Sequence, residues 1–238
     1  MSRKILDLLK RKPFALVGHR GAAGLEPENT IRSIKKAIEI GVDIVEVDVR
    51  STKDGKLVLL HDEDFNRLAN LNIKLRDLSL SETRNIRIKG ERIATLEEAI
   101  TTIDGVTGLF VEIKEPDVTE SVIDVVKEYG AEPWTAIVSF YDEALIKVAR
   151  FSRRIITGLI YFKPPGRIFE AKRLGARIVL PRYNIATVKA NAMAHKLGLY
   201  VVTWTINTIE LAKKLLKNGV DAIASDYPNR LAELRDSM

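Results

Sequence analysis

The chain of 238 residues has no cysteine and no glutamine, only three methionines and three histidines, and no apolar run approaching the ~18 residues that cross a bilayer. The absence of cysteine excludes a disulfide framework, a thiolate zinc site and a cysteine nucleophile. Charged residues make up 29% of the chain and hydrophobic residues 46%, a balance that argues against an integral membrane protein and against a disordered chain. Scarcity of Cys, Met and Gln is typical of heat-adapted proteins.

The net charge of the chain is +6. A surplus of surface lysine is the simpler explanation, and attraction of an anionic ligand such as phosphate is the other. The aromatic residues are scattered, without the aromatic and basic cluster of a single-strand binding platform. We therefore expect no nucleic-acid partner.

The N-terminal segment, residues 2–12, is basic and slightly amphipathic. It lacks the apolar core and cleavage site of a signal peptide, and we expect a cytoplasmic protein without stable membrane insertion. Residues 1–13 are expected to form a solvated lead-in, with packing against the domain or peripheral contact with a membrane as the alternatives. Residues 14–238 then form one domain, because no change of composition marks a second.

Short runs rich in Val, Ile and Leu alternate along the chain with helical patterns, as in proteins built on buried parallel strands. The predicted strands cover residues 14–18, 43–49, 108–113, 134–139, 155–160, 177–180, 199–205 and 221–224. Glycines at the predicted helix exits, such as Gly41 and Gly175, are typical of helix ends. Eight units of about 28 residues each predict a (β/α)₈ TIM barrel, and a doubly wound open sheet is the alternative.

A short insertion is predicted after the second strand. Asp54-Gly55 between two apolar runs is typical of a β-hairpin, which would pair residues 57–60 with that strand. Residues 62–94 are the least regular part of the chain. The T-x-x-E pattern from Thr95 to Glu98 is a capping box and predicts the start of a helix.

Acidic residues fall near the carboxyl ends of two predicted strands, where barrels of this class hold their active sites. Because side chains alternate along a strand, Glu46 and Asp48 share one face of theirs, and Glu112 and Lys114 share one face of the next. Three inward carboxylates make an all-oxygen site that suits Mg²⁺ or Ca²⁺, with Mn²⁺ as a further candidate. A surface salt-bridge cluster is the alternative, but a central barrel strand has no solvent-exposed side.

Two of the three histidines, His19 and His61, also lie at predicted strand ends, and histidine is well suited to proton transfer near neutral pH. His195 falls within a helical pattern and is expected to be structural or exposed. Arg20 and Lys114 add positive charge, and such a set is typical of phosphoryl chemistry. The G-x-S-x-G pattern is absent, so no covalent nucleophile is evident.

Other residues leave their roles open. Trp204 fits either the core or a wall of a substrate pocket. Asn29 or Thr30 fits a helix cap as well as a functional role. Asp226, which precedes Tyr227-Pro228, fits the N-cap of the last helix.

In these residues the chain resembles the glycerophosphodiester phosphodiesterase family, over residues 14–231 and in the family's order of motifs. The matching motifs are His19-Arg-Gly21, Pro27-Glu-Asn-Thr30, Glu46-Val-Asp48, Thr52-Lys-Asp-Gly55, His61-Asp62, Leu96-Glu-Glu-Ala99, Glu112-Ile-Lys114, Ser139-Phe140, Trp204-Thr-Ile-Asn207 and residues 219–228. The resemblance implies a TIM barrel that hydrolyses glycerophosphodiesters to sn-glycerol 3-phosphate and an alcohol, in lipid and glycerol metabolism.

The resemblance also implies roles for single residues. His19 and His61 would be the general acid and base, with the two roles not assigned. Glu46, Asp48 and Glu112 would hold one divalent cation. Substrate or phosphate would be bound by Arg20, Lys114 and Trp204. In the family's mechanism a hydroxyl of the substrate's own glycerol attacks phosphorus, and water opens the cyclic phosphate that results.

The chain departs from the family after His61-Asp62, where the family's arginine is kept as Arg67 but a threonine pair is absent and the insertion is short. The departure bears on substrate selectivity. A lysophospholipase D is therefore the second hypothesis, with an apolar groove formed by Phe65, Leu68, Leu71 and Ile73. A non-catalytic module that binds metal or phosphate is the third. The head group of the substrate and the oligomeric state stay open.

Overall fold

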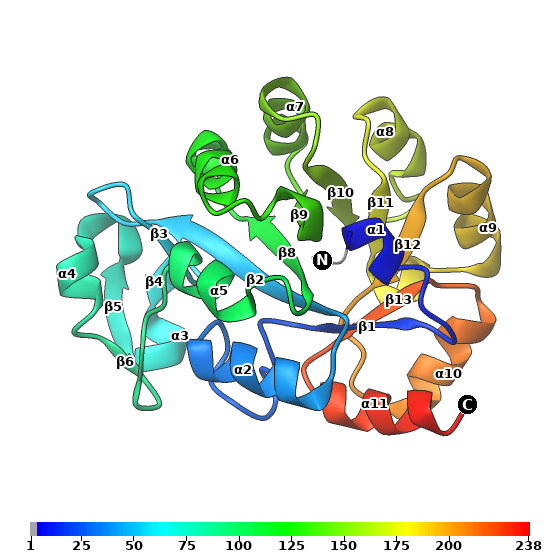
Figure 1. Ribbon diagram of the computed structural model, residues 1–238, viewed down its shortest axis with the longest axis horizontal. Coiled ribbons are helices and arrows are strands. Elements are labelled where there is room, and N and C mark those ends of the chain that lie inside the picture. The colour runs from blue at the N-terminus through cyan, green and yellow to red at the C-terminus, as the bar shows by residue number, and fades with distance from the viewer. Residues whose placement is uncertain (1–3) are drawn as a thin grey trace.

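Strand β1 (Ala15–Gly18) pairs in parallel with both β2 (Ile44–Ser51) and β13 (Ala222–Ser225), and this double pairing closes the sheet into a ring. The ring runs β1-β13-β12-β11-β10-β9-β8-β2, with every pairing parallel. Its other strands are β8 (Gly108–Ile113), β9 (Thr135–Ser139), β10 (Ile156–Tyr161), β11 (Ile178–Pro181) and β12 (Tyr200–Thr203). This computed structural model describes residues 4–238 (Figure 1). The predicted TIM barrel is confirmed, and the open-sheet alternative is wrong.

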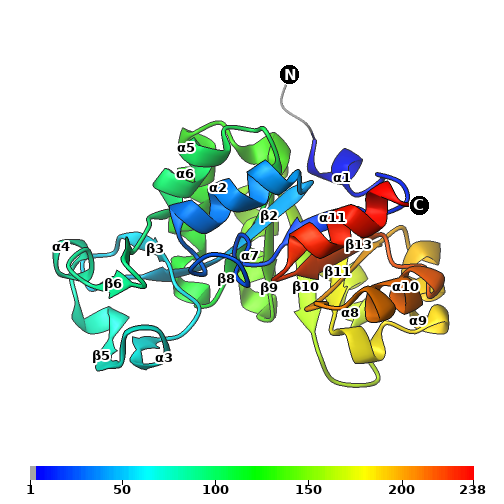
Figure 2. The same ribbon diagram turned by 90° about the horizontal axis from the view of Figure 1, so that it is seen from below.

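Each ring strand is followed by a helix that covers the outside of the barrel (Figures 1 and 2). These helices are α2 (Ile31–Ile40), α5 (Leu96–Ile103), α6 (Thr119–Glu128), α7 (Asp142–Phe151), α8 (Ile168–Arg173), α9 (Val188–Lys196), α10 (Ile209–Lys217) and α11 (Pro228–Asp236). Short 3₁₀ turns lie at η1 (Leu75–Asp77), η2 (Pro116–Val118), η3 (Glu132–Trp134) and η4 (Tyr183–Ile185). Within residues 4–238, none of the helices combines the length and the apolar character that a membrane span requires.

The predicted element boundaries agree closely with the structure. The predicted range of β8 coincides with the observed one, and those of the other ring strands differ by one or two residues at an end. Thr95 and Glu98 form the predicted capping box at the start of α5, each side chain bonded to the other's backbone N–H. Gly41 ends α2 with φ of 84°, a left-handed conformation that glycine adopts without a steric cost.

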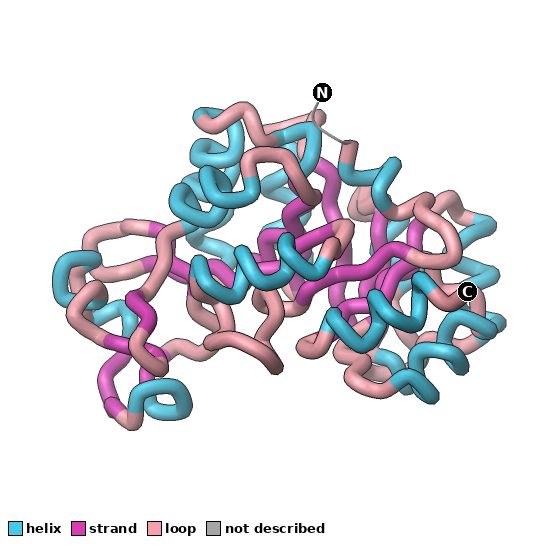
Figure 3. The backbone as a smooth tube through the Cα atoms, turned by 60° about the horizontal axis from the view of Figure 1, so that its bottom comes forward, coloured by secondary structure: helices cyan, strands magenta, loops and turns pink. Residues whose placement is uncertain are grey.

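Apolar side chains form two layers, one inside the ring and one between the ring and the helices. Figure 3 shows the helices around the strands. Val45, Val47 and Val49 of β2 belong to the outer layer, while Ile44 belongs to the inner one. Because the side chains of a strand alternate, Glu46 and Asp48 point into the ring. The predicted sharing of one face by these two acids is therefore confirmed.

Helix α1 (Ile5–Leu8) packs against the inner layer at the amino ends of the strands. Ile5 and Leu9 are each 1% exposed. A Cβ added to Gly108 would lie 2.6 Å from Ile5 Cδ1, so the helix fills the space left by this glycine. The expectation of a solvated lead-in is wrong for the described part of the segment, because small residues of the ring leave a hole that apolar side chains of α1 fill.

The predicted insertion lies between β2 and α5 and forms a lobe beside the barrel (Figure 2). It begins with β3 (Leu57–Leu59), which pairs antiparallel with β2 and confirms the predicted hairpin. The lobe continues through β4 (Asp64–Phe65), α3 (Asn66–Ala69), β5 (Leu71–Lys74), α4 (Leu80–Thr83), β6 (Arg87–Ile88) and β7 (Glu91–Arg92). It has a small core of its own, which includes Phe65 and Leu75.

The carboxylate of Asp43, just before β2, ties both ends of the described chain to the barrel. Asp43 Oδ1 lies 2.7 Å from Arg11 Nη1, and Asp43 Oδ2 lies 2.7 Å from Arg235 Nη1 of α11. The backbone N–H of Leu16 in β1 also donates to Asp43 Oδ2. Asp43 is 1% exposed and Arg235 is 8% exposed, so the pair between them is shielded from water.

Replacing Asp43 by alanine is expected to destabilise the fold by about 3–5 kcal/mol, because the buried guanidinium of Arg235 would lose its counter-charge. Urea unfolding of the variant measures the loss. Asp7→Ala is the matched control, since the pair of Asp7 with Lys10 is exposed and screened by solvent, so its removal should change the free energy of unfolding far less. Equal losses in the two variants would contradict the prediction.

Candidate active site

Three carboxylates meet inside the ring at the carboxyl ends of its strands. Glu46 and Asp48 come from β2 and Glu112 from β8, and the strand register places Asp48 directly beside Glu112. One oxygen of each acid lies within 4.8 Å of the others. All three side chains are buried, and Glu46 Oε1 has no hydrogen-bond partner among the described residues. Buried oxygens at this spacing could hold a metal ion.

The surroundings shift the pKa values of these acids in opposite directions. Burial, followed by the charge of Asp48, raises the pKa values of Glu46 and Glu112. Burial also acts to raise the pKa of Asp48, but the charges of Lys114 and Arg20 outweigh it and hold that pKa far below its usual range. The site therefore keeps Asp48 firmly ionised, while burial and the charge of Asp48 favour the neutral forms of Glu46 and Glu112.

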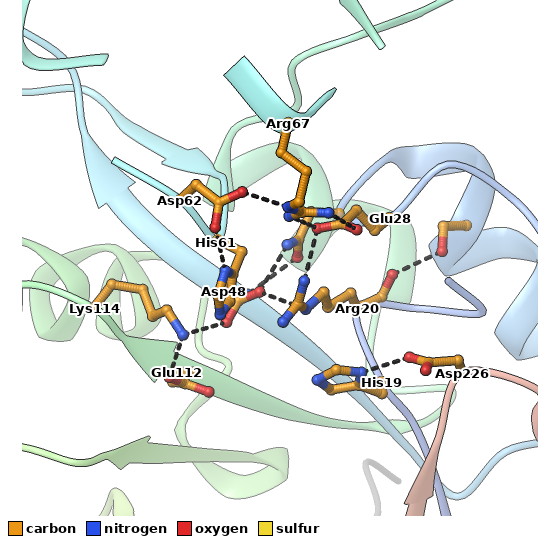
Figure 4. Close-up of polar contacts among 12 residues, drawn as sticks. His19, Arg20, Glu28, Asp48, His61, Asp62, Arg67, Glu112, Lys114 and Asp226 are labelled. Carbon is orange, nitrogen blue, oxygen red and sulfur yellow. Dashed lines mark hydrogen bonds and ion pairs between the residues drawn. The ribbon is translucent and has the colours of Figure 1, made fainter. Parts of the chain in front are cut away.

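Arg20 and Lys114 are the cations that contact this cluster. Lys114 Nζ lies 2.6 Å from Glu112 Oε1 and 3.1 Å from Asp48 Oδ1. Arg20 Nε lies 3.2 Å from Asp48 Oδ2, and the backbone N–H of Arg20 donates to Glu46 Oε2. Asn29 also donates from its side chain to Asp48 Oδ2 at 2.8 Å. Each cation thus stands beside a carboxylate and beside the open space of the ring (Figure 4).

His19 lies at the end of β1 and is oriented by a carboxylate from β13. Its Nδ1 lies 2.7 Å from Asp226 Oδ1, and Asn207 donates to the other oxygen of Asp226 at 2.8 Å. His19 Nε2 points toward the acids and lies 4.0 Å from Glu46 Oε2. Burial acts to lower the pKa of His19. The hydrogen bond to Asp226 and the charge of Glu46 together outweigh burial, so the pKa lies above its usual value.

His61 follows β3 and is held in a similar way. Its Nδ1 lies 2.7 Å from Asp62 Oδ1, and Arg50 donates to its backbone carbonyl at 2.9 Å. Burial lowers the pKa of His61, and the nearby charges of Lys114 and Arg20 also lower it, although Asp48 acts in the opposite direction. Both histidines therefore have Nδ1 bound to a carboxylate, which leaves Nε2 for proton transfer.

Arg67 of α3 links the insertion to the site (Figure 4). Its guanidinium contacts Asp62 Oδ2 at 2.6 Å and both oxygens of Glu28 at 2.7 and 2.8 Å. Glu28 in turn contacts Arg20 Nη1 at 2.8 Å. A continuous chain of charged contacts therefore runs from His61 through the insertion to Arg20.

The predicted site residues come together in the structure. His19, Arg20, Glu46, His61, Glu112, Lys114 and Trp204 line one cavity of about 150 Å³, and Asp48 contacts the cations at its edge. Trp204 belongs to the cavity wall and donates from Nε1 to the carbonyl of Leu180. His195 lies away from this cavity and pairs with Asp221 at 2.8 Å, as expected for a structural or exposed histidine.

Sequence reasoning missed the residues that orient the site. Asp226 fits a helix cap in the sequence, but its side chain binds His19, and Ser225 Oγ accepts the N–H of Tyr227 instead. Thr30 is the N-cap of α2, which leaves Asn29 to bind Asp48. Neither partner is near in sequence, so local pattern could not reveal these contacts.

Known proteins resemble the chain over nearly its whole length. The sequence profile of the glycerophosphoryl diester phosphodiesterase family matches residues 19–230. A glycerophosphodiester phosphodiesterase of Caldanaerobacter subterraneus subsp. tengcongensis is 33% identical over 236 residues, which cover 92% of this chain and 96% of the relative.

Two solved structures share the fold. A protein of Silicibacter pomeroyi, described as a glycerophosphoryl diester phosphodiesterase, has a TM-score of 0.92 and 24% identity, and the match covers 98% of this chain and 97% of that one. A phosphodiesterase of Oleispira antarctica, solved with its product sn-glycerol-3-phosphate, has a TM-score of 0.86 and 27% identity over 93% of this chain and 96% of that one. The family profile and the curated relative together show that the chain belongs to the glycerophosphoryl diester phosphodiesterase family and is a phosphoric diester hydrolase.

Proposed function

We propose that the protein hydrolyses glycerophosphodiesters to sn-glycerol 3-phosphate and an alcohol, in a reaction that depends on a divalent cation. The observation that carries the proposal is the meeting of three buried carboxylates, two carboxylate-bound histidines and two cations at one small cavity. The product bound to the Oleispira antarctica relative supports the class of substrate.

Glu46, Asp48 and Glu112 would hold the cation, since an all-oxygen donor set suits Mg²⁺, Ca²⁺ or Mn²⁺. The unpartnered Glu46 Oε1 supports this fit, because a buried acceptor needs a partner. When bound, the cation supplies Lewis-acid polarisation of a phosphoryl oxygen. Arg20 and Lys114 would bind phosphate oxygens and stabilise the charge that develops on them.

His19 and His61 would move the protons. One Nε2 takes the proton of the glycerol hydroxyl beside the phosphate, as the oxygen of that hydroxyl bonds to phosphorus. The other Nε2 protonates the oxygen of the departing alcohol, as its bond to phosphorus breaks. Water then opens the cyclic phosphate. No nucleophile from the protein is required, which agrees with the lack of cysteine and of a serine motif.

The size of the cavity favours a small diester over a lysophospholipid. A cavity of about 150 Å³ has no room within it for a long acyl chain, which would have to lie outside the cavity. The residues considered for an apolar groove do not line it: Phe65 and Leu68 pack in the core of the insertion, and Leu71 and Ile73 are exposed elsewhere.

Chelation of divalent cations with EDTA is expected to lower the release of glycerol 3-phosphate from glycerophosphodiesters by about 100-fold or more, because the phosphoryl oxygen loses its Lewis acid. Addition of Mg²⁺, Ca²⁺ or Mn²⁺ should restore the rate in the wild type but not in Glu112→Gln. Glu120→Gln, at an exposed position of α6, is the control. Full activity in EDTA would contradict the metal dependence.

Replacement of His19 or His61 by alanine is expected to lower kcat by about 10²–10⁴-fold, the usual contribution of a general acid or base. His195→Ala should leave kcat unchanged, since this histidine lies outside the cavity. Steady-state kinetics with a coupled glycerol 3-phosphate assay measure all three variants, and circular dichroism checks their folding. A His19→Ala enzyme with wild-type kcat would rule out the role given to this residue.

Asp226→Asn is expected to lower kcat by about 10–100-fold with little change of KM, because the amide no longer fixes the ring of His19. Asp221→Asn makes the same chemical change in the His195 pair, outside the cavity, and serves as the control. An equal effect of the two substitutions on kcat would point to a general loss of stability instead.

A further inference from the structure

A second depression adjoins the catalytic cavity at the mouth of the barrel. Phe140, after β9, and Ile160 of β10 line both spaces. The second depression has a volume of about 360 Å³, and its other walls come from Tyr161 and the loop of residues 162–167, between β10 and α8. In both views α8 lies on the opposite side of the ring from the insertion (Figures 1 and 2).

Size and contacts decide which part of a diester reaches this depression. The catalytic cavity has room for little more than the glycerophosphate, so the alcohol portion has to extend toward the mouth. On the side of the insertion, the guanidinium of Arg67 joins Glu28 and Asp62, which are the partners of Arg20 and His61. The side of the loop 162–167 is hollow instead.

The walls of the depression are suited to a carbon skeleton. Phe140 contacts Trp204 edge to face with ring centres 5.8 Å apart, and contacts Phe162 in the same way at 5.9 Å. These three rings form a continuous aromatic row from the catalytic cavity to the outer loop. Pro164 and Pro165 continue the apolar lining and restrict the backbone of the loop.

The charge of the depression is positive. Its charged lining residues are Lys163 and Arg167, and no aspartate or glutamate lines it. Arg167 is already neutralised by both oxygens of Asp142, at 2.8 and 2.6 Å. Within residues 4–238 Lys163 has no carboxylate partner, and its ammonium lies 5.4 Å from the ring centre of Phe162. A cationic group entering the depression would therefore meet a ring whose attraction for cations is already used by Lys163.

We propose that Phe140 and the loop 162–167 bind the alcohol portion of the diester, and that Lys163 makes this subsite select uncharged or anionic alcohols over cationic ones. The proposal rests on the proposed phosphodiesterase function. Lys163 acts here through its charge on the bound alcohol and takes no part in the bond changes at phosphorus. Like-charge repulsion at this position disfavours a quaternary or primary ammonium head group.

The test compares kcat/KM for three diesters in the presence of Mg²⁺: glycerophosphoinositol, glycerophosphocholine and the methyl ester of glycerol 3-phosphate. The wild type is expected to prefer the inositol diester to the choline diester. Lys163→Glu should shift this preference toward choline by about 5–10-fold, as expected for reversal of one exposed charge, and should leave the rate on the methyl ester unchanged. Lys35→Glu, on the outer face of α2 with the same charge change, should shift nothing.

The outcomes separate the two levels of the proposal. No hydrolysis of any diester would overturn the proposed function itself. Hydrolysis with a preference that Lys163→Glu leaves unchanged, or shifts away from choline, would overturn the subsite alone. A selective loss of kcat/KM on lysophosphatidylcholine in Phe162→Ala, without loss on the inositol diester, would assign the depression to an acyl chain and also overturn it.

Discussion

Three carboxylates in a buried space less than 5 Å across repel one another, and the rest of the site is built around that repulsion. Lys114 and Arg20 place positive charge against Asp48 and Glu112, and Asn29 donates to Asp48. Glu46 is the acid left without such compensation at one oxygen. The parallel register of β2 and β8 makes the repulsion unavoidable, because it sets Asp48 and Glu112 side by side. A divalent cation held by the three acids, as proposed, would offset this repulsion.

Closure of the ring brings the second half of the site together. Gly18 pairs with Ser225, so the residues that follow them, His19 and Asp226, emerge side by side from the first and last ring strands. The same closure is held at the opposite end of the barrel by Asp43, which contacts Arg11 and Arg235. The orientation of one histidine thus depends on contacts between segments more than 200 residues apart. Its counterpart, His61, depends on a neighbour in sequence and on Arg67 of the insertion.

Local patterns were sufficient to predict the ring strands, the start of α5 and the inward face of Glu46 and Asp48, because alternation and capping are decided within a few residues. The family resemblance added the roles of the histidines and cations, which remain proposals. Contacts between residues far apart in sequence could not be predicted from local patterns. Asp226 has the same sequence context whether it caps a helix or binds His19. The short apolar pattern of Ile5, Leu8 and Leu9 likewise does not reveal that Gly108 leaves a space for it on the inner wall of the ring.

The short N-terminal helix α1 closes the barrel at the amino ends of its strands. With Ile5 and Leu9 buried at the amino ends of the strands, the ring is a blind well with its polar groups near the open end. Within residues 4–238, the apolar side chains of the inner layer and of α1 fill the ring toward its amino end, so whatever binds at depth enters and leaves through the mouth. Of two fragments produced in such a well, the one nearer the mouth has to leave first, and the deeper one blocks the next substrate until it follows.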